Sequence, residues 1–210
     1  MTTHNFCVAS LSVSQQLQKR GFDLFISSLG LFLAWWIIIV AWFAASFDTR
    51  SNGFFIQKRV GRNGKIFRVV KLKTMRPVAG IDTSVTLRGD LRITPLGAFF
   101  RRTKIDELPQ LWNVLVGDMS VVGPRPDLPG FADTLQGEAR AMLSIRPGIT
   151  GPATLKYRYE EELLALQTDP ELYNREVIWP DKVRINLDYI RSWSLQRDIQ
   201  YTLETVLIKC

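Results

Sequence analysis

The longest apolar stretch of the chain lies near its N-terminus. From Leu24 to Phe47 there are 24 consecutive uncharged residues, rich in Leu, Ile, Phe and Trp. A helix of that length can cross the hydrocarbon core of a bilayer, and a buried soluble helix is rarely apolar for so long. The pattern therefore predicts a membrane-embedded helix over residues 19–49, after a polar N-terminal tail over residues 1–18.

Basic residues flank this stretch on both sides. Lys19 and Arg20 precede it, and five cations follow it within a short distance: Arg50, Lys58, Arg59, Arg62 and Lys65. The positive-inside rule places both flanks in the cytoplasm, whereas a straight span would leave one of them on the other side. A helix that enters one leaflet, bends and returns satisfies both ends, so we expect a re-entrant helix.

The remaining residues, 50–210, alternate short strand-like and helix-like patterns. Two β-prone runs, Phe54–Val60 and Lys65–Lys71, surround the tight-turn pair Asn63-Gly64 and predict a β-hairpin. Pro95 opens a short helix to Arg102 that buries Phe99 and Phe100, and residues 78–90 read as a loop. Further helices are expected over residues 108–115, 131–145, 160–167, 169–178, 180–191 and 195–209.

These elements predict an α+β fold: the membrane-embedded helix, then one compact, mostly helical catalytic domain over residues 50–210 with a small β-hairpin. Two apolar stripes mark the last helices. One comprises Val183, Leu187 and Ile190, and the other comprises Leu195, Ile199, Leu203 and Leu207. Core packing is the expected role of both stripes, with contact to a membrane surface as the alternative.

Charge is concentrated behind the apolar stretch. Between Arg50 and Lys104 there are fourteen Lys or Arg residues against two acids, and the whole chain carries a net charge of +7. Such a basic segment suits anionic lipids and phosphorylated substrates, but it would also suit nucleic acid. Two distant cysteines, Cys7 and Cys210, and one histidine, His4, give neither a zinc motif nor a disulfide framework.

Two adjacent carboxylates, Asp106 and Glu107, stand where the helix over residues 108–115 begins. Pro109 fits the first turn of that helix, because no amide donor is needed there. The helix dipole and the cations nearby in the sequence favour ionised carboxylates, and an ionised Asp can attack phosphorus. The alternative is that the pair simply caps the helix.

Arg125 lies between two prolines in the stretch Gly123–Pro126. The prolines restrict the backbone, so little freedom is lost when the guanidinium binds an anion. A structural turn would use the same prolines, and the sequence alone does not separate these two roles.

Several motifs together resemble those of one family, the bacterial sugar transferases, which are small monotopic phosphoglycosyl transferases. They are residues 104–115 (KIDELPQLWNVL), 117–120 (GDMS), 123–126 (GPRP) and 146–151 (RPGITG). The resemblance runs from about Lys19 to Arg158 and implies a re-entrant membrane helix. The family usually has a Ser-Pro pair at the bend, where this chain has Trp35-Trp36.

The resemblance also implies a reaction, in which a sugar 1-phosphate passes from a UDP-sugar to a polyprenyl phosphate such as undecaprenyl phosphate, releasing UMP. Asp106 would be the nucleophile, and Glu107 would bind Mg²⁺ or assist the acceptor. The cations that match phosphate-binding or nucleotide-binding positions of the family are Lys73, Arg101, Arg125 and Arg158.

Anionic membrane lipids are further expected partners, and the expected location is the cytoplasmic face of a bacterial inner membrane. Nucleic acid is not an expected partner under this assignment, and the competing function is a membrane-tethered nucleic-acid-binding protein. The family's Gln-Val-Asn-Gly-Arg ending is replaced by residues 154–158 (TLKYR), so the identity of the sugar does not follow. The sequence also leaves the oligomeric state open.

Overall fold

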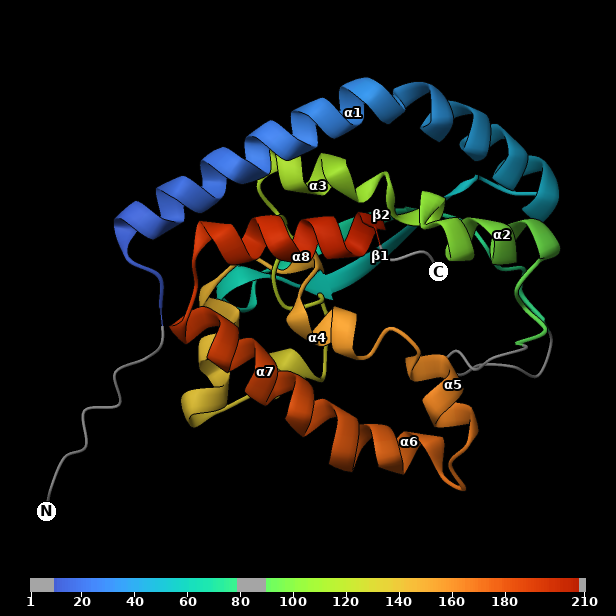
Figure 1. Cartoon of the computed structure of the whole chain (residues 1–210). Coiled ribbons are helices and arrows are strands. Elements are labelled where there is room, and N and C mark those ends of the chain that lie inside the picture. Colours follow the sequence, from blue (N-terminus) through green and yellow to red (C-terminus); the bar gives the residue numbers. More distant parts are fainter. Residues whose placement is uncertain (1–9, 79–89, 208–210) are drawn as a thin grey trace, which may run out of the picture.

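The computed structural model describes residues 10–78 and 90–207, and within them it confirms the α+β class. Figure 1 shows a long helix arching over a domain built from short helices around two small sheets. The helices are α1 (Val13–Thr49), α2 (Pro95–Thr103), α3 (Gln110–Val116), α4 (Pro152–Lys156), α5 (Glu160–Ala165), α6 (Pro170–Tyr173), α7 (Trp179–Arg191) and α8 (Leu195–Leu207). The strands are β1 (Phe54–Val60), β2 (Ile66–Leu72), β3 (Ser120–Val122) and β4 (Gly148–Thr150).

Helix α1 begins earlier than the sequence pattern indicated. Ser12 caps it through a capping box with Gln15, so the helix includes residues that were assigned to the polar tail. It ends at Thr49, followed by Arg50 in the left-handed conformation. Among the described residues, α1 is the one helix that is long and apolar enough to cross a membrane.

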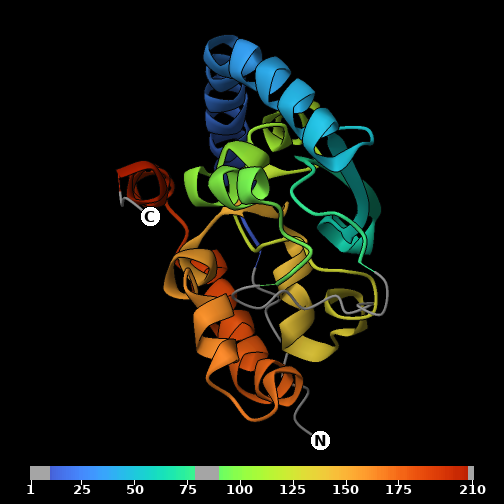
Figure 2. The same cartoon turned by 90° about the vertical axis from the view of Figure 1, so that its right-hand side faces the viewer.

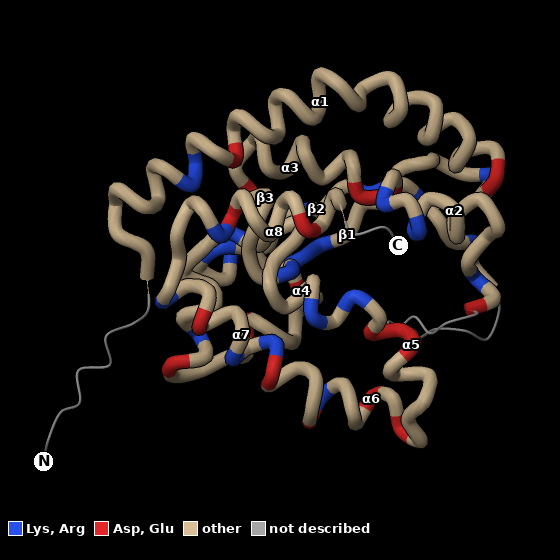
Figure 3. The backbone as a smooth tube through the Cα atoms, in the orientation of Figure 1, with Lys and Arg blue, Asp and Glu red and all other residues tan. Residues whose placement is uncertain are grey.

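The exposed and buried faces of α1 differ in residue size. Its buried apolar positions are the small residues Ala34, Ala41 and Ala45. Large side chains, among them Phe32, Trp35, Trp36, Phe43 and Phe47, are exposed. Figure 3 shows charged residues near the two ends of α1 and none along the arch between them. A broad apolar surface is therefore left without protein cover in this chain.

Both ends of α1 contact the same domain. Near its start, Arg20 donates to the carbonyls of Val114 and Leu115 at the C-terminal end of α3, over 2.7 and 2.8 Å. Near its end, Ala41 and Ala45 pack with Leu72, Phe100 and their neighbours in one apolar cluster. Figure 2 shows the two halves of α1 running in different directions, so the helix leaves the domain and returns to it.

The predicted hairpin is confirmed. β1 and β2 pair antiparallel from Phe54 opposite Leu72 to Val60 opposite Ile66. Asn63 and Gly64 turn the chain with φ values of 58° and 77°, a left-handed conformation that Asn and Gly adopt most readily. The loop expected over residues 78–90 lies almost entirely outside the described residues.

A second sheet, which the sequence patterns did not indicate, consists of β3 and β4 in parallel. Gly148 lies so close to Gly123 that a Cβ atom on Gly148 would stand 2.1 Å from the Gly123 nitrogen. Only glycine allows this approach. The short parallel pair therefore ties the Gly123–Pro126 stretch to the segment that follows Arg146.

The C-terminal half agrees with the sequence in part. Helices α5, α7 and α8 lie where they were expected, and Val183, Leu187 and Ile190 of α7 are buried as predicted. The helix expected over residues 131–145 is wrong, because this stretch forms two separate 3₁₀ segments, Ala132–Thr134 and Gly137–Ser144. Gly137, at φ 57°, interrupts any continuous α-helix.

Core packing is also wrong for most of the stripe on α8 and for one residue of α2. Leu195 packs against the central apolar cluster, but Ile199, Leu203 and Leu207 are exposed. On α2, Phe100 is buried and Phe99 is exposed. In both helices an apolar pattern identified the amphipathic face without showing how much of that face the domain covers.

Candidate active site

Asp106 and Glu107 lie in a 3₁₀ turn, Ile105–Glu107, between α2 and α3. Lys104 precedes the turn with φ 59°, and its carbonyl accepts from the Glu107 amide over 3.2 Å. Pro109 is the residue before the first turn of α3, and neither carboxylate caps that helix. The alternative interpretation, in which the two carboxylates cap this helix, is therefore wrong. The turn instead directs the two side chains into the domain.

Asp106 is 8% exposed, and its Oδ1 atom is buried without a hydrogen-bond partner in the part of the chain that the structure describes. Burial, and then the charge of Glu107, raises the pKa of Asp106 to about 6, although Lys71, Lys104 and Arg101 pull it the other way. The sequence predicted lowered pKa values for both carboxylates; for Asp106 this is wrong in direction, because the cations compensate only part of the desolvation, whereas for Glu107 the direction is confirmed. At neutral pH the Asp106 carboxylate is still mostly ionised.

Among the described residues, Glu107 forms ion pairs and Asp106 forms none. The Glu107 Oε1 atom accepts from Arg125 Nη2 over 2.8 Å and lies 3.7 Å from Lys71 Nζ. Burial alone would raise the pKa of Glu107, but Arg125, Lys71 and Lys104 together hold it well below its usual range. Glu107 is therefore a fixed negative charge beside a carboxylate of higher proton affinity.

The backbone on both sides of Arg125 is held by hydrogen bonds. The Gly148 amide donates to the Pro124 carbonyl over 2.8 Å, and Arg59 Nη1 donates to the Pro126 carbonyl over 3.1 Å. The Arg125 side chain nevertheless remains 44% exposed. It can therefore hold Glu107 with one edge and offer further N–H donors to a bound anion.

Lys71 was not among the residues selected from the sequence. Its Nζ atom is 3.7 Å from Glu107 Oε1, while Lys73 Nζ donates to Ser51 Oγ, two residues after the end of α1, over 2.8 Å. Burial, and then the neighbouring Arg125, lowers the pKa of Lys71 to about 8. Lys71 is the one lysine of β2 and falls on the same face of the strand as the buried Phe67 and Val69, so the alternation of the strand could have identified it.

The other two predicted cations lie in different surroundings. Arg101 Nε donates to Thr74 Oγ1 over 3.2 Å, its Nη1 lies 3.3 Å from Glu161, and its charge acts on Asp106. Arg158 lies in the turn between α4 and α5 and makes no hydrogen bond or ion pair with any described residue. The structure thus brings Arg101 and Arg125 to the dyad but shows no contact from Lys73 or Arg158.

Magnesium was expected at Glu107, and the donor set at the dyad is small. The described ranges, 10–78 and 90–207, contain no group of three or more His, Cys, Asp or Glu residues that could hold a metal ion. Glu107 Oε1 already faces two cations, whereas Asp106 Oδ1 has no partner. Mg²⁺ commonly binds one or two carboxylates together with substrate phosphates and water. The two carboxylates fit a magnesium ion that is bound jointly by the protein, the substrate phosphates and water. They do not fit a site in which the protein supplies all the ligands.

Comparison with known proteins agrees with the motifs. A Bacillus subtilis (strain 168) protein provisionally named an undecaprenyl-phosphate N-acetylgalactosaminyl 1-phosphate transferase is 37% identical over 76% of this chain and 87% of its own length. A Caulobacter vibrioides UDP-glucose:undecaprenyl-phosphate glucose-1-phosphate transferase is 35% identical over 92% of this chain and 70% of its own length. An undecaprenyl-phosphate glucose phosphotransferase from Komagataeibacter xylinus is 36% identical over 93% of this chain and 36% of its own length.

The match to a family is equally extensive. The sequence model of the bacterial sugar transferases matches residues 14–210, which include α1, the dyad and the C-terminal helices. A match over nearly the whole chain, together with relatives above 30% identity, leaves no room for a chance resemblance of short motifs. This protein belongs to the bacterial sugar transferase family and is a phosphoglycosyl transferase.

Proposed function

We propose that this protein transfers a sugar 1-phosphate from a UDP-sugar to polyprenyl phosphate, most simply undecaprenyl phosphate, and releases UMP through a covalent intermediate on Asp106. The named relatives act on undecaprenyl phosphate, which supports the acceptor. The observation that carries the mechanism is the pairing of Asp106, with its unpartnered buried oxygen, and Glu107, which two cations hold in place.

In the first step, a carboxylate oxygen of Asp106 attacks the sugar-linked phosphorus of the UDP-sugar. A bond forms between Asp106 and that phosphorus, and the bond to the bridging oxygen breaks, so UMP leaves with the electron pair. The raised pKa of Asp106 suits this role, because a carboxylate with a higher proton affinity is a stronger nucleophile and is still ionised at neutral pH.

In the second step, a phosphate oxygen of the polyprenyl phosphate attacks the same phosphorus. The bond to Asp106 breaks, the carboxylate is restored, and the product is a polyprenyl diphosphate sugar. Glu107 stays ionised through both steps, so it can orient Arg125 and Lys71 toward the phosphates or assist the acceptor. Charge neutralisation and positioning are the main requirements of phosphoryl transfer.

Arg101, Arg125 and Lys71 are the cations best placed to bind the phosphates. Arg101 and Lys71 act electrostatically on Asp106, and Arg125 contacts Glu107 directly. Lys73 and Arg158 keep the phosphate-binding or nucleotide-binding roles that the family resemblance implies, although neither contacts the dyad. Magnesium, when bound by Glu107 or Asp106 together with substrate phosphates, would neutralise further phosphate charge.

We further propose that α1 is re-entrant in a bacterial inner membrane, with the catalytic domain on its cytoplasmic face. Both ends of α1 pack on one domain, and its large apolar side chains are exposed between them. The basic segment that follows α1 would contact anionic lipid headgroups. This arrangement would also bring the dyad close to the surface from which a lipid-linked phosphate can be reached.

One assay tests the function. Purified protein in detergent is incubated with undecaprenyl phosphate, Mg²⁺ and a panel of UDP-sugars, and UMP and the lipid-linked product are measured. Release of UMP with formation of a polyprenyl diphosphate sugar for at least one donor is the expected result. If no UDP-sugar reacts and the protein binds oligonucleotides at physiological salt, the result would favour the alternative, a nucleic-acid-binding protein.

A further inference from the structure

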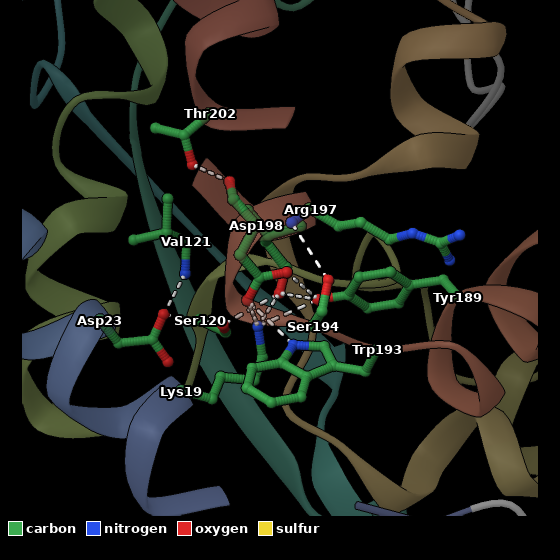
Figure 4. Close-up of polar contacts among 11 residues, drawn as sticks. Lys19, Asp23, Ser120, Val121, Tyr189, Trp193, Ser194, Arg197, Asp198 and Thr202 are labelled. Atoms are coloured by element: carbon green, nitrogen blue, oxygen red, sulfur yellow. Dashed lines mark hydrogen bonds and ion pairs between the residues drawn. The ribbon is translucent and has the colours of Figure 1, made fainter. Parts of the chain in front are cut away.

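A buried polar cluster joins the membrane helix to the strand that leads into Arg125 (Figure 4). Asp23 of α1 is 1% exposed, although it directly precedes the apolar stretch. Its Oδ1 atom accepts from the Val121 amide over 2.9 Å and from Ser120 Oγ over 2.9 Å. A carboxylate on the anchor helix therefore binds β3 directly.

Lys19 makes a second connection, one helical turn before Asp23. Its Nζ atom donates to the Val122 carbonyl over 2.8 Å, to Asp198 Oδ2 of α8 over 2.7 Å and to the Tyr189 hydroxyl of α7 over 3.1 Å. Asp198 is completely buried and also accepts from the Tyr189 hydroxyl and from Trp193 Nε1. Figure 4 shows these side chains converging on one point between α1, α7 and α8.

The backbone groups of β3 have two different sets of hydrogen-bond partners. On one edge, β3 pairs with the β4 segment: the Ser120 amide donates to the Pro147 carbonyl, and the Gly123 amide donates to the Thr150 carbonyl. The Val121 amide and the Val122 carbonyl have other partners, namely Asp23 and Lys19. Asp23 and Lys19 of α1 thus hydrogen-bond to buried backbone groups of β3 where a neighbouring strand would otherwise pair. The Val122 carbonyl also accepts from Ser120 Oγ over 2.9 Å and from the Tyr189 hydroxyl over 3.4 Å, whereas the Val121 amide donates to Asp23.

This edge lies close to the proposed site. Val122 is followed by Gly123, Pro124 and then Arg125, whose guanidinium holds Glu107. The intervening residues have little freedom, because Gly123 contacts Gly148 closely and the Pro124 carbonyl accepts from the Gly148 amide. A displacement of β3 would therefore be transmitted to Arg125 without much loss.

We propose that Asp23 and Lys19 are positioning residues for the transfer reaction. They fix β3, and through β3 they fix Arg125 against Glu107, so the seating of the membrane helix determines the geometry of the dyad. This inference rests on the proposed function for its catalytic consequence. Its structural part, the restraint of residues 120–125 by α1, can be tested without any activity.

Three variants test the catalytic part. Asp23→Ala removes both bonds to β3 and should lower kcat by on the order of tenfold to a hundredfold. Asp23→Asn keeps a carbonyl oxygen that can accept from the Val121 amide, so it should restore most of that loss. Ser27→Ala is the matched control, because Ser27 is buried one turn further along α1 and, within the described ranges, its hydroxyl bonds to the Leu24 carbonyl of its own helix and to no residue of β3. Equal losses of kcat in Asp23→Ala and Ser27→Ala would show that Asp23 contributes only to packing and does not position β3.

A double-mutant cycle tests whether Asp23 acts through Arg125. If it does, Asp23→Ala should have little further effect in an Arg125→Ala background, because the group it positions is already gone. A role in overall stability would instead multiply with the Arg125→Ala effect. Fully multiplicative losses would overturn the proposal, whatever the single variants show.

Hydrogen exchange supplies the readout that does not depend on activity. In detergent-solubilised full-length protein, Asp23→Ala should accelerate exchange in peptides covering residues 119–126, and exchange in α7 should stay unchanged. Asp23→Asn and Ser27→Ala should match the wild type. Unchanged exchange at residues 119–126 in Asp23→Ala would refute the restraint, even if the wild-type protein is fully active. If Asp23→Ala accelerates exchange at residues 119–126 but the wild type has no transferase activity, the proposed function is refuted and the restraint of β3 by α1 is still supported.

Discussion

Asp106 and Glu107 are consecutive residues, yet their carboxylates lie in opposite electrostatic environments. The pKa of Asp106 rises to about 6, chiefly through burial, while Arg125, Lys71 and Lys104 overcome burial and hold the pKa of Glu107 far below its usual range. The difference arises because the 3₁₀ turn points one side chain at two cations and leaves an oxygen of the other without a partner. Two titratable groups whose pKa values are shifted in opposite directions suit two different roles in catalysis.

The raised pKa of Asp106 predicts an effect on the stability of the fold. A carboxyl whose pKa is raised in the folded state destabilises the fold once it ionises, so stability falls as the pH rises from about 4 to about 6. Asp106→Asn should therefore stabilise the protein at pH 7, by up to about 3 kcal/mol for a shift of about 2 pKa units, and by less at pH 5. Thermal unfolding in detergent at both pH values measures this.

The matched control for that measurement is Asp188→Asn, because Asp188 is exposed and its one ion pair among the described residues is with Arg191 on the same helix. Its effect should stay within about 0.5 kcal/mol at either pH. A lower melting temperature for Asp106→Asn than for wild type at pH 7 would contradict the assigned environment of Asp106. Loss of transferase activity together with a gain in stability would be the signature of a strained functional group.

Lys71 and Lys73 provide a second comparison. Lys71 approaches Glu107 and Lys73 contacts Ser51, so Lys71→Met should lower kcat/KM by at least tenfold, and Lys73→Met should lower it much less. Because burial and Arg125 lower the pKa of Lys71 to about 8, its charge is lost as the pH rises through that value. Activity of the wild type should therefore decline above about pH 8, and the upper limb of the profile should change in Lys71→Met.

Steady-state kinetics over a pH series checks this prediction. A larger loss in Lys73→Met than in Lys71→Met would show that the family resemblance identified the correct lysine, and that the contact with Ser51 gives way when substrate binds. An unchanged upper limb in Lys71→Met would assign the decline to another group.

The sequence predicted the hairpin and most of the helices, but not the parallel pair β3–β4 or the burial of Asp106. Asn63-Gly64 identified the hairpin because a tight turn depends on the conformational preferences of those two residues alone. The sign of the Asp106 pKa shift was wrong because it depends on burial, which requires the packing of β2, the Arg125 segment and α2 around the turn. Nearby cations in the sequence were easy to see, and the desolvation that outweighs them was not.

Long-range contacts account for the other differences. Lys19 and Asp198 are 179 residues apart in the chain, and no local pattern relates them. In the sequence, Lys19 is one of the cations that predict a cytoplasmic start of α1. The structure shows that Lys19 also hydrogen-bonds to β3. Likewise, the stripe on α8 showed an amphipathic helix, but whether Ile199 and Leu203 are covered depends on where that helix docks.

The topology of α1 gives a third prediction. Single cysteines at positions 14 and 52, in a background with Cys7 and Cys210 replaced by serine, should both be protected from a membrane-impermeant thiol reagent in intact cells. Both should react once the cells are permeabilised, because both ends of α1 lie beside the catalytic domain. Labelling of position 14 alone in intact cells would establish a full span in place of the re-entrant helix.

The covalent mechanism makes the sharpest prediction. Because the first step needs no acceptor, protein incubated with a reactive UDP-sugar and Mg²⁺ alone should release UMP in a stoichiometric burst and gain the mass of one phosphosugar on Asp106. Asp106→Asn should abolish the adduct. Asp106→Glu should nearly abolish it, because moving the attacking oxygen by about 1 Å can cost on the order of a hundredfold in rate.

Glu107→Gln separates the two carboxylates in the same experiment. It keeps the nucleophile but removes the negative charge that holds Arg125 and Lys71, so the adduct should form slowly and still map to Asp106. Intact-protein mass spectrometry after rapid quenching, followed by peptide mapping, measures both the extent and the position of the modification. UMP release that strictly requires polyprenyl phosphate, with no adduct at any quench time, would favour direct transfer in a ternary complex. Asp106 would then act on the phosphates or a bound cation without forming a bond to phosphorus.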